Sequence, residues 1–319
     1  SVQAVCEEVM LKSSRHLHRL TGSKNLVMAG GVALNCVGNG RILREGPFEN
    51  VWIQPAAGDA GSSLGVALAI ANAKADGERP ARVNGADAMR GACLGPEYSE
   101  GEIRETLETF GATYEEMTDD ALFPFVAGKL ASENIVGWFQ GRMEFGPRSL
   151  GNRSILGDPH SAAMQQTLNL KIKYRESFRP FAPAVLNEDV REYFDLDTAS
   201  PYMLLVSDVT KDKLLDLSAE DQAKTGFDKL NVVRSDVPAI THVDNSARVQ
   251  TVHMETNPRF HRLLSSFKNK TGRGVLVNTS FNVRDEPIVC TPEDAYKCFM
   301  ATEMDVLVLG NYVLAKEQQ

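Results

Sequence analysis

The sequence contains few of the features that mark secreted, membrane-spanning or nucleic-acid-binding proteins. Its 319 residues include five cysteines, an odd number without a C-x-x-C pair, which indicates buried thiols in a reducing cytoplasm rather than a disulfide framework. No apolar run reaches the roughly 18 residues that a membrane-spanning helix needs, and no signal-peptide pattern is present. A formal net charge of −8 argues against a broad DNA- or RNA-binding surface. We therefore expect a cytoplasmic protein that acts on small molecules.

What the sequence does contain is two α/β blocks. In the first, strands at 26–29 and 51–54 each lead into a glycine-rich turn and a helix, which is typical of a nucleotide-binding unit. We place this block at 1–78, a polar linker at 79–98 and a second, mixed α/β block at 99–319. The chain starts at Ser1 within a helical pattern, so we expect it to be a fragment of a longer protein.

Helix and strand signals alternate through the second block. Ser99 and Glu102 have capping-box spacing, and Thr291 before Pro292 marks another helix start. We expect further helices at 119–133, 160–173 and 259–270, strands at 135–139, 182–186, 203–209, 275–277, 305–309 and 312–315, and a charged surface excursion at 210–235.

Two turns of the first block are candidate ligand sites. The Gly30–Gly31 turn, which leads towards Asn35, lets a phosphate approach the backbone beside a helix N-terminus. Asp59 lies in a second glycine-flanked turn, where a carboxylate can hold a divalent cation that bridges phosphates. The alternatives are a plain connection at the glycine pair and a helix cap at Asp59.

The strongest signal is a basic region inside this acidic chain. Residues 142–179 carry a net charge of +4, so the remainder sums to −12. The candidate catalytic residues of this region are Arg148, Arg153, Lys173, Arg175 and Arg179. Arginine binds phosphate and carboxylate through its planar fork, and the interleaved Gly, Pro and aromatic residues favour a packed loop over a solvated face. If 172–175 is extended, Lys173 and Arg175 project from the same face of the chain. We expect a site for one or two anions.

Polar side chains also follow the strand expected at 275–277. Alternation places Asn278, Ser280 and Asn282 on one face, where side chains leaving a strand often contact ligands; turn formation is the alternative. A less specific polar cluster spans 242–248 and includes Arg248. We assign these four residues to nucleotide binding.

Four long motifs carry a resemblance to a known family. They are GGVALN at 30–35, FGPRSLGNRSIL at 145–156, K-x-R-x-x-x-FRPFAP at 173–183 and LVNTSFN at 276–282. In this order they resemble the O-carbamoyltransferases of nodulation and antibiotic-tailoring pathways. The resemblance implies part of an actin/hexokinase/Hsp70-like ATPase subdomain followed by a mixed α/β YrdC-like domain, with a homodimer as the assembly.

The resemblance also implies a two-step reaction. Carbamoyl phosphate and ATP, the latter with Mg²⁺, form carbamoyl-adenylate in the YrdC-like domain, and the carbamoyl group then passes to a hydroxyl of a natural product or saccharide. Lys173 and Arg175 hold phosphate and carbamoyl oxygens, Arg148, Arg153 and Arg179 support them, and Ser280 and Asn282 contact the nucleotide. Asp59 matches a ligand of the divalent metal of the transfer site, expected to be Fe²⁺, but the family's upstream histidine ligands have no counterpart here.

Three other functions remain open from the sequence. A non-catalytic nucleotide-binding module is the main rival, since a fragment can bind without turnover. Threonylcarbamoyl-adenylate synthesis for tRNA modification is disfavoured by the acidic composition. The hydrogenase-maturation carbamoyltransferases are disfavoured because the zinc-binding cysteine pairs are lacking.

Overall fold

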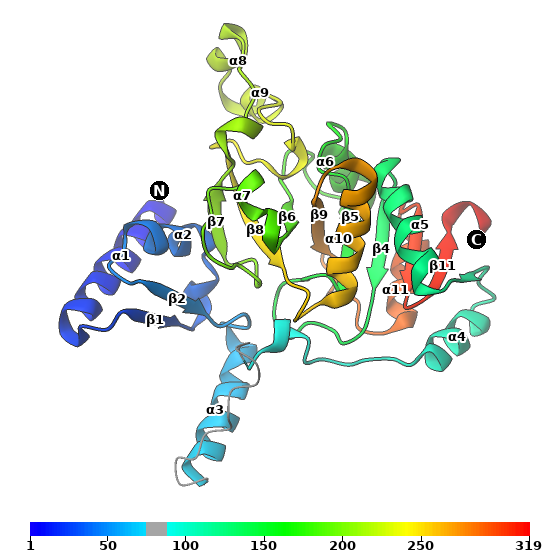
Figure 1. Cartoon of the computed structure of the whole chain (residues 1–319), viewed down its shortest axis with the longest axis horizontal. Coiled ribbons are helices and arrows are strands. Elements are labelled where there is room, and N and C mark those ends of the chain that lie inside the picture. Colours follow the sequence, from blue (N-terminus) through cyan, green and yellow to red (C-terminus); the bar gives the residue numbers. More distant parts are fainter. Residues whose placement is uncertain (75–87) are drawn as a thin grey trace.

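The computed structural model describes residues 1–74 and 88–319 and contains two β-sheets (Figure 1). The helices are α1 (Val2–Thr21), α2 (Cys36–Glu45), α3 (Asp59–Lys74), α4 (Glu100–Thr109), α5 (Asp119–Ala131), α6 (Met164–Thr167), α7 (Val190–Tyr193), α8 (Ala219–Ala223), α9 (Gly226–Leu230), α10 (Pro258–Thr271) and α11 (Pro292–Met300). The strands are β1 (Asn25–Met28), β2 (Asn50–Ile53), β3 (Glu115–Glu116), β4 (Val136–Phe139), β5 (Arg153–Gly157), β6 (Ala182–Leu186), β7 (Leu205–Asp208), β8 (Ser246–Val252), β9 (Val275–Ser280), β10 (Val306–Leu309) and β11 (Tyr312–Ala315). No helix in the described ranges is both long and apolar enough to cross a membrane.

The first block is built on the parallel pair β1–β2. Helices α1 and α2 enclose a small core with it, which includes Leu11, Leu26 and Ile42. The two glycine-rich turns meet at the carboxyl ends of the strands, where the Gly30 N–H donates to the Ala57 carbonyl at 2.8 Å. A one-turn 3₁₀ helix (Gly31–Leu34) precedes α2, so the predicted single helix is in fact two segments.

Helix α3 projects from the rest of the molecule (Figure 1). It starts at Asp59, and none of its residues is buried. Its apolar side chains Val66, Leu68 and Ile70 are all more than half exposed. Small and apolar residues around the whole helix, with no buried stripe, are typical of a helix that packs against something on several sides.

The second sheet has nine strands in the order β3-β11-β10-β4-β5-β9-β6-β8-β7. The pairs β4–β10 and β6–β8 are parallel and the other pairs are antiparallel. Helices α5 and α10 pack on each other and on one face, where Phe123, Trp138 and Phe267 are fully buried. The predicted mixed α/β architecture is confirmed, with a large mixed sheet at its centre.

Capping residues fix several helix ends as predicted. Ser99 and Glu102 form a reciprocal capping box on α4, and Thr291 and Asp294 form another on α11 behind Pro292. These contacts satisfy the free N–H groups of the first turn, so each helix starts at a defined residue.

Three strands were not predicted. The two-residue β3 is exposed. β5 lies inside the arginine-rich motif, and β8 begins within the polar cluster at 242–248. β5 and β8 are almost entirely buried, so most of their polar side chains lie inside the protein instead of facing solvent. Hydrophobic alternation therefore gave no sign of either strand.

The predicted excursion at 210–235 carries the short helices α8 and α9 and projects at one end of the sheet (Figure 1). Residues 79–87 of the predicted linker lie outside the described residues. Its described part is packed: Met89 and Ala92 belong to the large core, and the Gly95 N–H donates to Met143. This segment therefore runs beside the arginine-rich motif.

Candidate functional site

Four arginines converge on one cavity of about 390 Å³. Arg148 comes from the loop before β5, Arg175 and Arg179 from the loop before β6, and Arg248 from β8. The other lining residues are Cys36, Val37, Pro147, Ser149, Pro180, Phe181, Ala182, Met203, Val206, His242, Asn278, Thr279 and Ser280. None of the described residues in this lining is acidic. The cavity is therefore a strongly cationic space of the size of a small-molecule site.

Several buried polar atoms of the lining have no hydrogen-bond partner among the described residues. They are Arg148 Nε, Ser149 Oγ, Arg248 Nε and Asn278 Oδ1. Unpaired buried polar atoms are costly, so four in one cavity indicate a polar ligand. Burial, and next the neighbouring Arg148, lower the pKa of Arg248 to about 10. A bound anion would compensate both for the unpaired polar atoms and for the burial and repulsion that lower the pKa of Arg248.

Lys173 lies beside this cavity and is almost completely buried. Its ammonium donates to the Ser280 carbonyl and to Asn282, with 2.8 Å to Oδ1 and 2.9 Å to the carbonyl oxygen. Ser280 Oγ also donates to Asn282 Oδ1 at 2.6 Å. The resemblance implies that Lys173 binds phosphate and carbamoyl oxygens and that Ser280 and Asn282 contact the nucleotide. The structure joins the three residues in one hydrogen-bonded group.

The prediction that 172–175 is extended is wrong. Residues Leu168–Ile172 form a π-helical turn, Lys173 has helical φ and ψ, and Tyr174 has φ of +47°. The side chains of Lys173 and Arg175 therefore do not project from the same face of the chain. Arg175 Nε donates to Asn169 Oδ1 at 2.6 Å and its guanidinium lies over Phe181. The two cations remain close enough that Arg175 lowers the pKa of Lys173 further, after burial.

The state of Lys173 predicts a dependence of stability on pH. Burial, then Arg175, lower its pKa from 10.5 to about 7. Between pH 7 and 10.5 the unfolded chain holds a proton that the folded chain does not, so this lysine makes the fold more stable as pH rises through that window. In thermal melts, the melting temperature of the wild type should increase relative to that of Lys173→Met from pH 7 to pH 10. A difference in melting temperature that does not change with pH would contradict this state.

The loop that presents Arg148 is held by a carboxylate that the sequence analysis missed. Glu144 is buried, and its Oε1 accepts from the backbone N–H groups of Leu150 at 2.5 Å and Asn152 at 2.9 Å. Burial raises the pKa of Glu144, although these N–H groups oppose the shift. An acidic residue immediately before Phe145-Gly-Pro was the available sequence signal.

Side chains from β8 and β9 hold the same loop from the other side. Asn278 Nδ2 donates to Gln250 Oε1 at 2.7 Å and to the Ser149 carbonyl at 3.2 Å. Gln250 Nε2 donates to the Leu150 carbonyl at 2.7 Å. Gln250 was also missed, because β8 was not recognised as a strand.

The structure does not bring Arg153 into the cavity. Its guanidinium is completely buried, lies 3.5 Å from the Phe139 ring centroid and donates to the carbonyl groups of Gln140, Gly141 and Pro96. Burial lowers its pKa to about 10, while Glu144 acts in the opposite direction. Through these hydrogen bonds Arg153 links the backbone at residues 96, 140 and 141, outside the cavity lining.

The first block contributes one wall of the cavity through Cys36 and Val37 at the start of α2. Asn35 caps this helix by accepting from the Gly38 N–H at 3.1 Å. Gly30, with φ of +94°, and Gly31 are exposed in the preceding turn and line neither this cavity nor the next one. Helix α2 is fastened to β7 by Asn39 and Arg44, which donate to the Leu204 and Val206 carbonyl groups.

Asp59 is an exposed residue in the first turn of α3. Within residues 1–74 and 88–319, no three His, Cys, Asp or Glu side chains gather in a way that could hold a metal ion. A single exposed carboxylate does not fit Fe²⁺, which needs several protein ligands. The described residues therefore do not fit an iron site.

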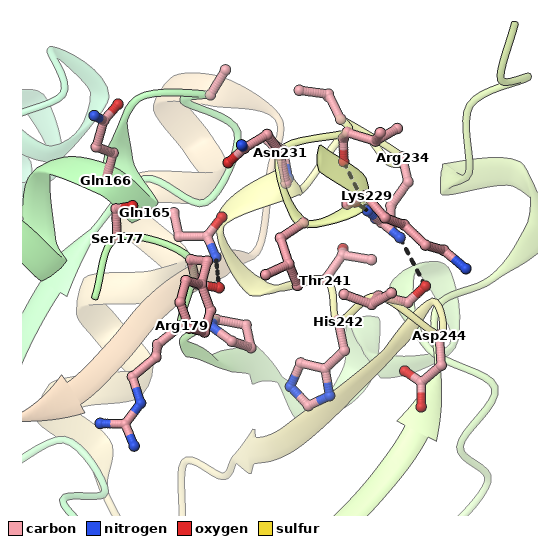
Figure 2. Close-up of a pocket in the computed structure, with 18 residues that line it drawn as sticks. Gln165, Gln166, Ser177, Arg179, Lys229, Asn231, Arg234, Thr241, His242 and Asp244 are labelled. Carbon is pink, nitrogen blue, oxygen red and sulfur yellow. Dashed lines mark hydrogen bonds between the residues drawn. The ribbon is translucent and has the colours of Figure 1, made fainter. Parts of the chain in front are cut away.

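A larger cavity of about 930 Å³ adjoins the arginine cavity (Figure 2). The two share Arg179, Pro180 and His242. Its polar lining comes from α6 and the segment after it, from the excursion and from the turn before β8: Gln165, Gln166, Ser177, Lys229, Asn231, Arg234, Thr241 and Asp244. An extended ligand could therefore occupy both spaces.

Comparisons with known proteins agree with this arrangement. A family model described as "Carbamoyltransferase C-terminus" matches residues 127–316, and one described as "Carbamoyltransferase N-terminus" matches residues 1–68. The chain is 59% identical to an uncharacterised protein of Synechocystis sp. over all of its length and 52% of that protein. It is 38% identical to nodulation protein NolNO of Sinorhizobium fredii, with 99% of this chain and 43% of the relative covered.

An enzyme is also among the relatives. The chain is 34% identical to the 3'-hydroxymethylcephem-O-carbamoyltransferase of Amycolatopsis lactamdurans, over 90% of this chain and 48% of that enzyme. The chain thus spans about half the length of the curated relatives it matches.

Proposed function

The chain belongs to the carbamoyltransferase family, and from this premise we propose that its arginine cavity activates carbamoyl phosphate with ATP. The reaction joins the carbamoyl group to adenylate and releases phosphate and pyrophosphate. The observation that carries the proposal is the convergence of four arginines on a space whose lining leaves four buried polar atoms without partners.

Electrostatics explain why such a cavity suits this reaction. Carbamoyl phosphate and ATP are both anions, and their reacting ends repel each other in water. Arg148 and Arg248 supply fixed positive charge in the interior of the cavity, and the exposed Arg179 supplies it at the border with the larger cavity. Preorganised cations stabilise the charge that develops on the departing phosphate and pyrophosphate without reorganising during the reaction.

In this proposal the two substrates together extend over both cavities. The phosphates of both substrates lie among the arginines, beside Ser280 of the lining, which Lys173 and Asn282 hold in place through hydrogen bonds. The lining of the arginine cavity offers no carboxylate, so Mg²⁺ would be carried by the phosphates of ATP. We derive no step through Fe²⁺, since the described residues do not fit it.

For the whole protein we propose transfer of the carbamoyl group to a hydroxyl of a small molecule or saccharide. Support comes from the cephem relatives, whose name states a hydroxymethyl acceptor. We assign residues 1–78 to an ATPase-like transfer subdomain, because the N-terminal family model ends at 68, and residues 99–319 to a YrdC-like domain. The additional length of the relatives is where we expect the remaining groups of the transfer site.

The test is carbamoyl-phosphate-dependent release of pyrophosphate from ATP by this chain. We expect release that requires both substrates, and isothermal titration should show binding of each. Binding without release would favour the nucleotide-binding module instead. Release that depends on threonine and bicarbonate, and not on carbamoyl phosphate, would favour threonylcarbamoyl-adenylate synthesis.

Removal of one cavity arginine should weaken the binding of polyphosphate. Arg148→Gln and Arg248→Gln each delete the charge of a partly buried side chain whose Nε has no partner among the described residues, so the fold loses little. Because a charge-assisted hydrogen bond contributes about 1.5–3 kcal/mol, we expect pyrophosphate affinity to fall roughly 10- to 100-fold in each variant by calorimetry. Arg191→Gln on α7, which lines neither cavity, is the matched control. Equal pyrophosphate affinities in all variants would show that the phosphates do not bind in this cavity.

A further inference from the structure

His242 stands where the two cavities meet, and the proposed reaction does not yet use it. It lines both spaces, and Figure 2 shows it along the same border of the larger cavity as Arg179 and Asp244. Its position is fixed by the backbone, because the His242 N–H donates to the Ser246 carbonyl at 2.8 Å and Asn245 closes the turn with φ of +65°.

A chain of hydrogen bonds sets which ring nitrogen of His242 carries the proton. Ser246 Oγ donates to Asp244 Oδ1 at 2.7 Å, and the Ser246 N–H reaches the same oxygen. Burial acts to raise the pKa of Asp244, but these two bonds outweigh it and lower that pKa, so the carboxylate accepts. With its proton committed to Asp244, Ser246 Oγ must accept from His242 Nδ1 at 3.1 Å. Nε2 is then the ring nitrogen without a proton, as a general base requires.

The charges around the ring keep it neutral. Burial lowers the pKa of His242, Asp244 opposes the shift and Arg248 adds to it. The other charged groups that line the two cavities beside it are Arg148, Arg175, Arg179, Lys229 and Arg234. This predominantly cationic surrounding disfavours an imidazolium, so His242 can accept a proton at neutral pH.

Other described residues of the linings are less suited to this role. Asp244 is engaged by Ser246, and the Cys36 thiol is hydrogen-bonded to Arg248. Lys173 lines neither cavity, and its nitrogen is surrounded by oxygens of Ser280 and Asn282. His242 is the only imidazole in the described lining of either space.

The stoichiometry of the proposed function demands such a base. Releasing both phosphate and pyrophosphate consumes one water, because carbamoyl phosphate must be hydrolysed to carbamate and phosphate before carbamate attacks ATP. We propose that His242 is the general base for this water. This inference rests on the proposed function and adds a catalytic residue to it.

The step balances as follows in atoms and protons. The water oxygen bonds to the carbonyl carbon while a water proton passes to His242 Nε2. The bond from that carbon to the bridging oxygen breaks, and phosphate leaves with the electron pair and receives the proton from His242 as HPO₄²⁻. The carbamic acid that remains loses its acidic proton to solvent. The resulting carbamate then attacks the α-phosphorus of ATP and expels pyrophosphate.

The deciding experiment compares two carbamate sources. The chain, His242→Gln, Ser246→Ala and the control His16→Gln, an exposed position on α1, are assayed for pyrophosphate release with carbamoyl phosphate or with ammonium bicarbonate, which supplies carbamate directly. With carbamoyl phosphate we expect His242→Gln to be slower by about 10²-fold and Ser246→Ala by a smaller factor. With ammonium bicarbonate both should match the wild type, because the water step is bypassed.

Any other pattern of rates with the two carbamate sources contradicts the inference, and each pattern shows which part of it is wrong. Equal losses with both carbamate sources assign His242 to substrate binding or to structure, and no loss removes it from the reaction. A wild type that is inactive with both sources contradicts the proposed function itself.

A second measurement does not depend on turnover. Nitrogen-15 NMR of the histidine-labelled chain at pH 7 should show His242 neutral, with the proton on Nδ1, and Ser246→Ala should shift this tautomer preference. A charged ring, or a proton on Nε2, would overturn the proposal. In the pH profile of the wild type, activity should fall as pH drops through the lowered pKa of His242, and this acidic limb should disappear in His242→Gln.

Discussion

Lys173→Met should reduce carbamoyl-phosphate-dependent pyrophosphate release by about 10³-fold, at the upper end of what removal of one preorganised donor costs. The ammonium fixes the Ser280 carbonyl and both oxygen groups of Asn282 in one arrangement beside the arginines. Without it, the acceptors lose their common donor, and Ser280, which lines the arginine cavity, loses the bond that holds it in place. The measurement is the steady-state rate with saturating ATP.

Lys173→Arg is the informative companion variant. Arginine keeps the charge, but its planar fork cannot direct donors to the same cluster of oxygens that a compact ammonium reaches. We expect it to fold and to remain at least about 10²-fold slower than the wild type. If either variant retained wild-type turnover, Lys173 would have no part in catalysis.

Glu144→Ala should have the largest effect on stability. The buried carboxylate accepts the Leu150 and Asn152 N–H groups and lies close enough to Arg153 to raise the pKa of that guanidinium against the effect of burial. Removing one member of a buried charged group typically costs about 3–5 kcal/mol, because the partner charge and donors stay buried. For a chain of this size that corresponds to a fall in melting temperature of roughly 5–15 °C.

The control for this prediction is Glu144→Gln. The amide oxygen of glutamine has the same reach and can still accept the two N–H groups, while the charge beside Arg153 is lost. We expect a loss intermediate between the wild type and Glu144→Ala by thermal and urea unfolding. If Glu144→Ala had the same melting temperature as the wild type, the loop that carries Arg148 would not depend on the Glu144 carboxylate.

Sequence reasoning succeeded where a local pattern determines local structure. The capping residues Ser99 and Thr291 start their helices, and the strand at 275–277 was recognised from its apolar run. The grouping of Lys173 with Ser280 and Asn282 could be expected only through the family resemblance, since these residues lie 107 and 109 positions apart.

It failed where long-range contacts replace an apolar pattern. Arg153 reads as a ligand-binding cation, yet its two terminal nitrogens donate to backbone carbonyl groups around it. Gln250 and Glu144 are polar in sequence and buried in the fold, because each has its partners in a distant or irregular segment. The tautomer of His242 depends on the Ser246–Asp244 bond, which no spacing rule reveals.

The order of strands has a consequence for how the chain is synthesised. β4 at the centre of the sheet pairs in parallel with β10, so Val136 faces Val306 across the ladder. At about 5–20 residues per second, the ribosome needs roughly 10–30 s to make the intervening chain. Throughout that interval β4 has an unpaired edge, and such long-range pairings are intrinsically slow to form. We expect the nascent chain to depend on chaperones until β10 is released, and truncations before 306 to aggregate rather than fold.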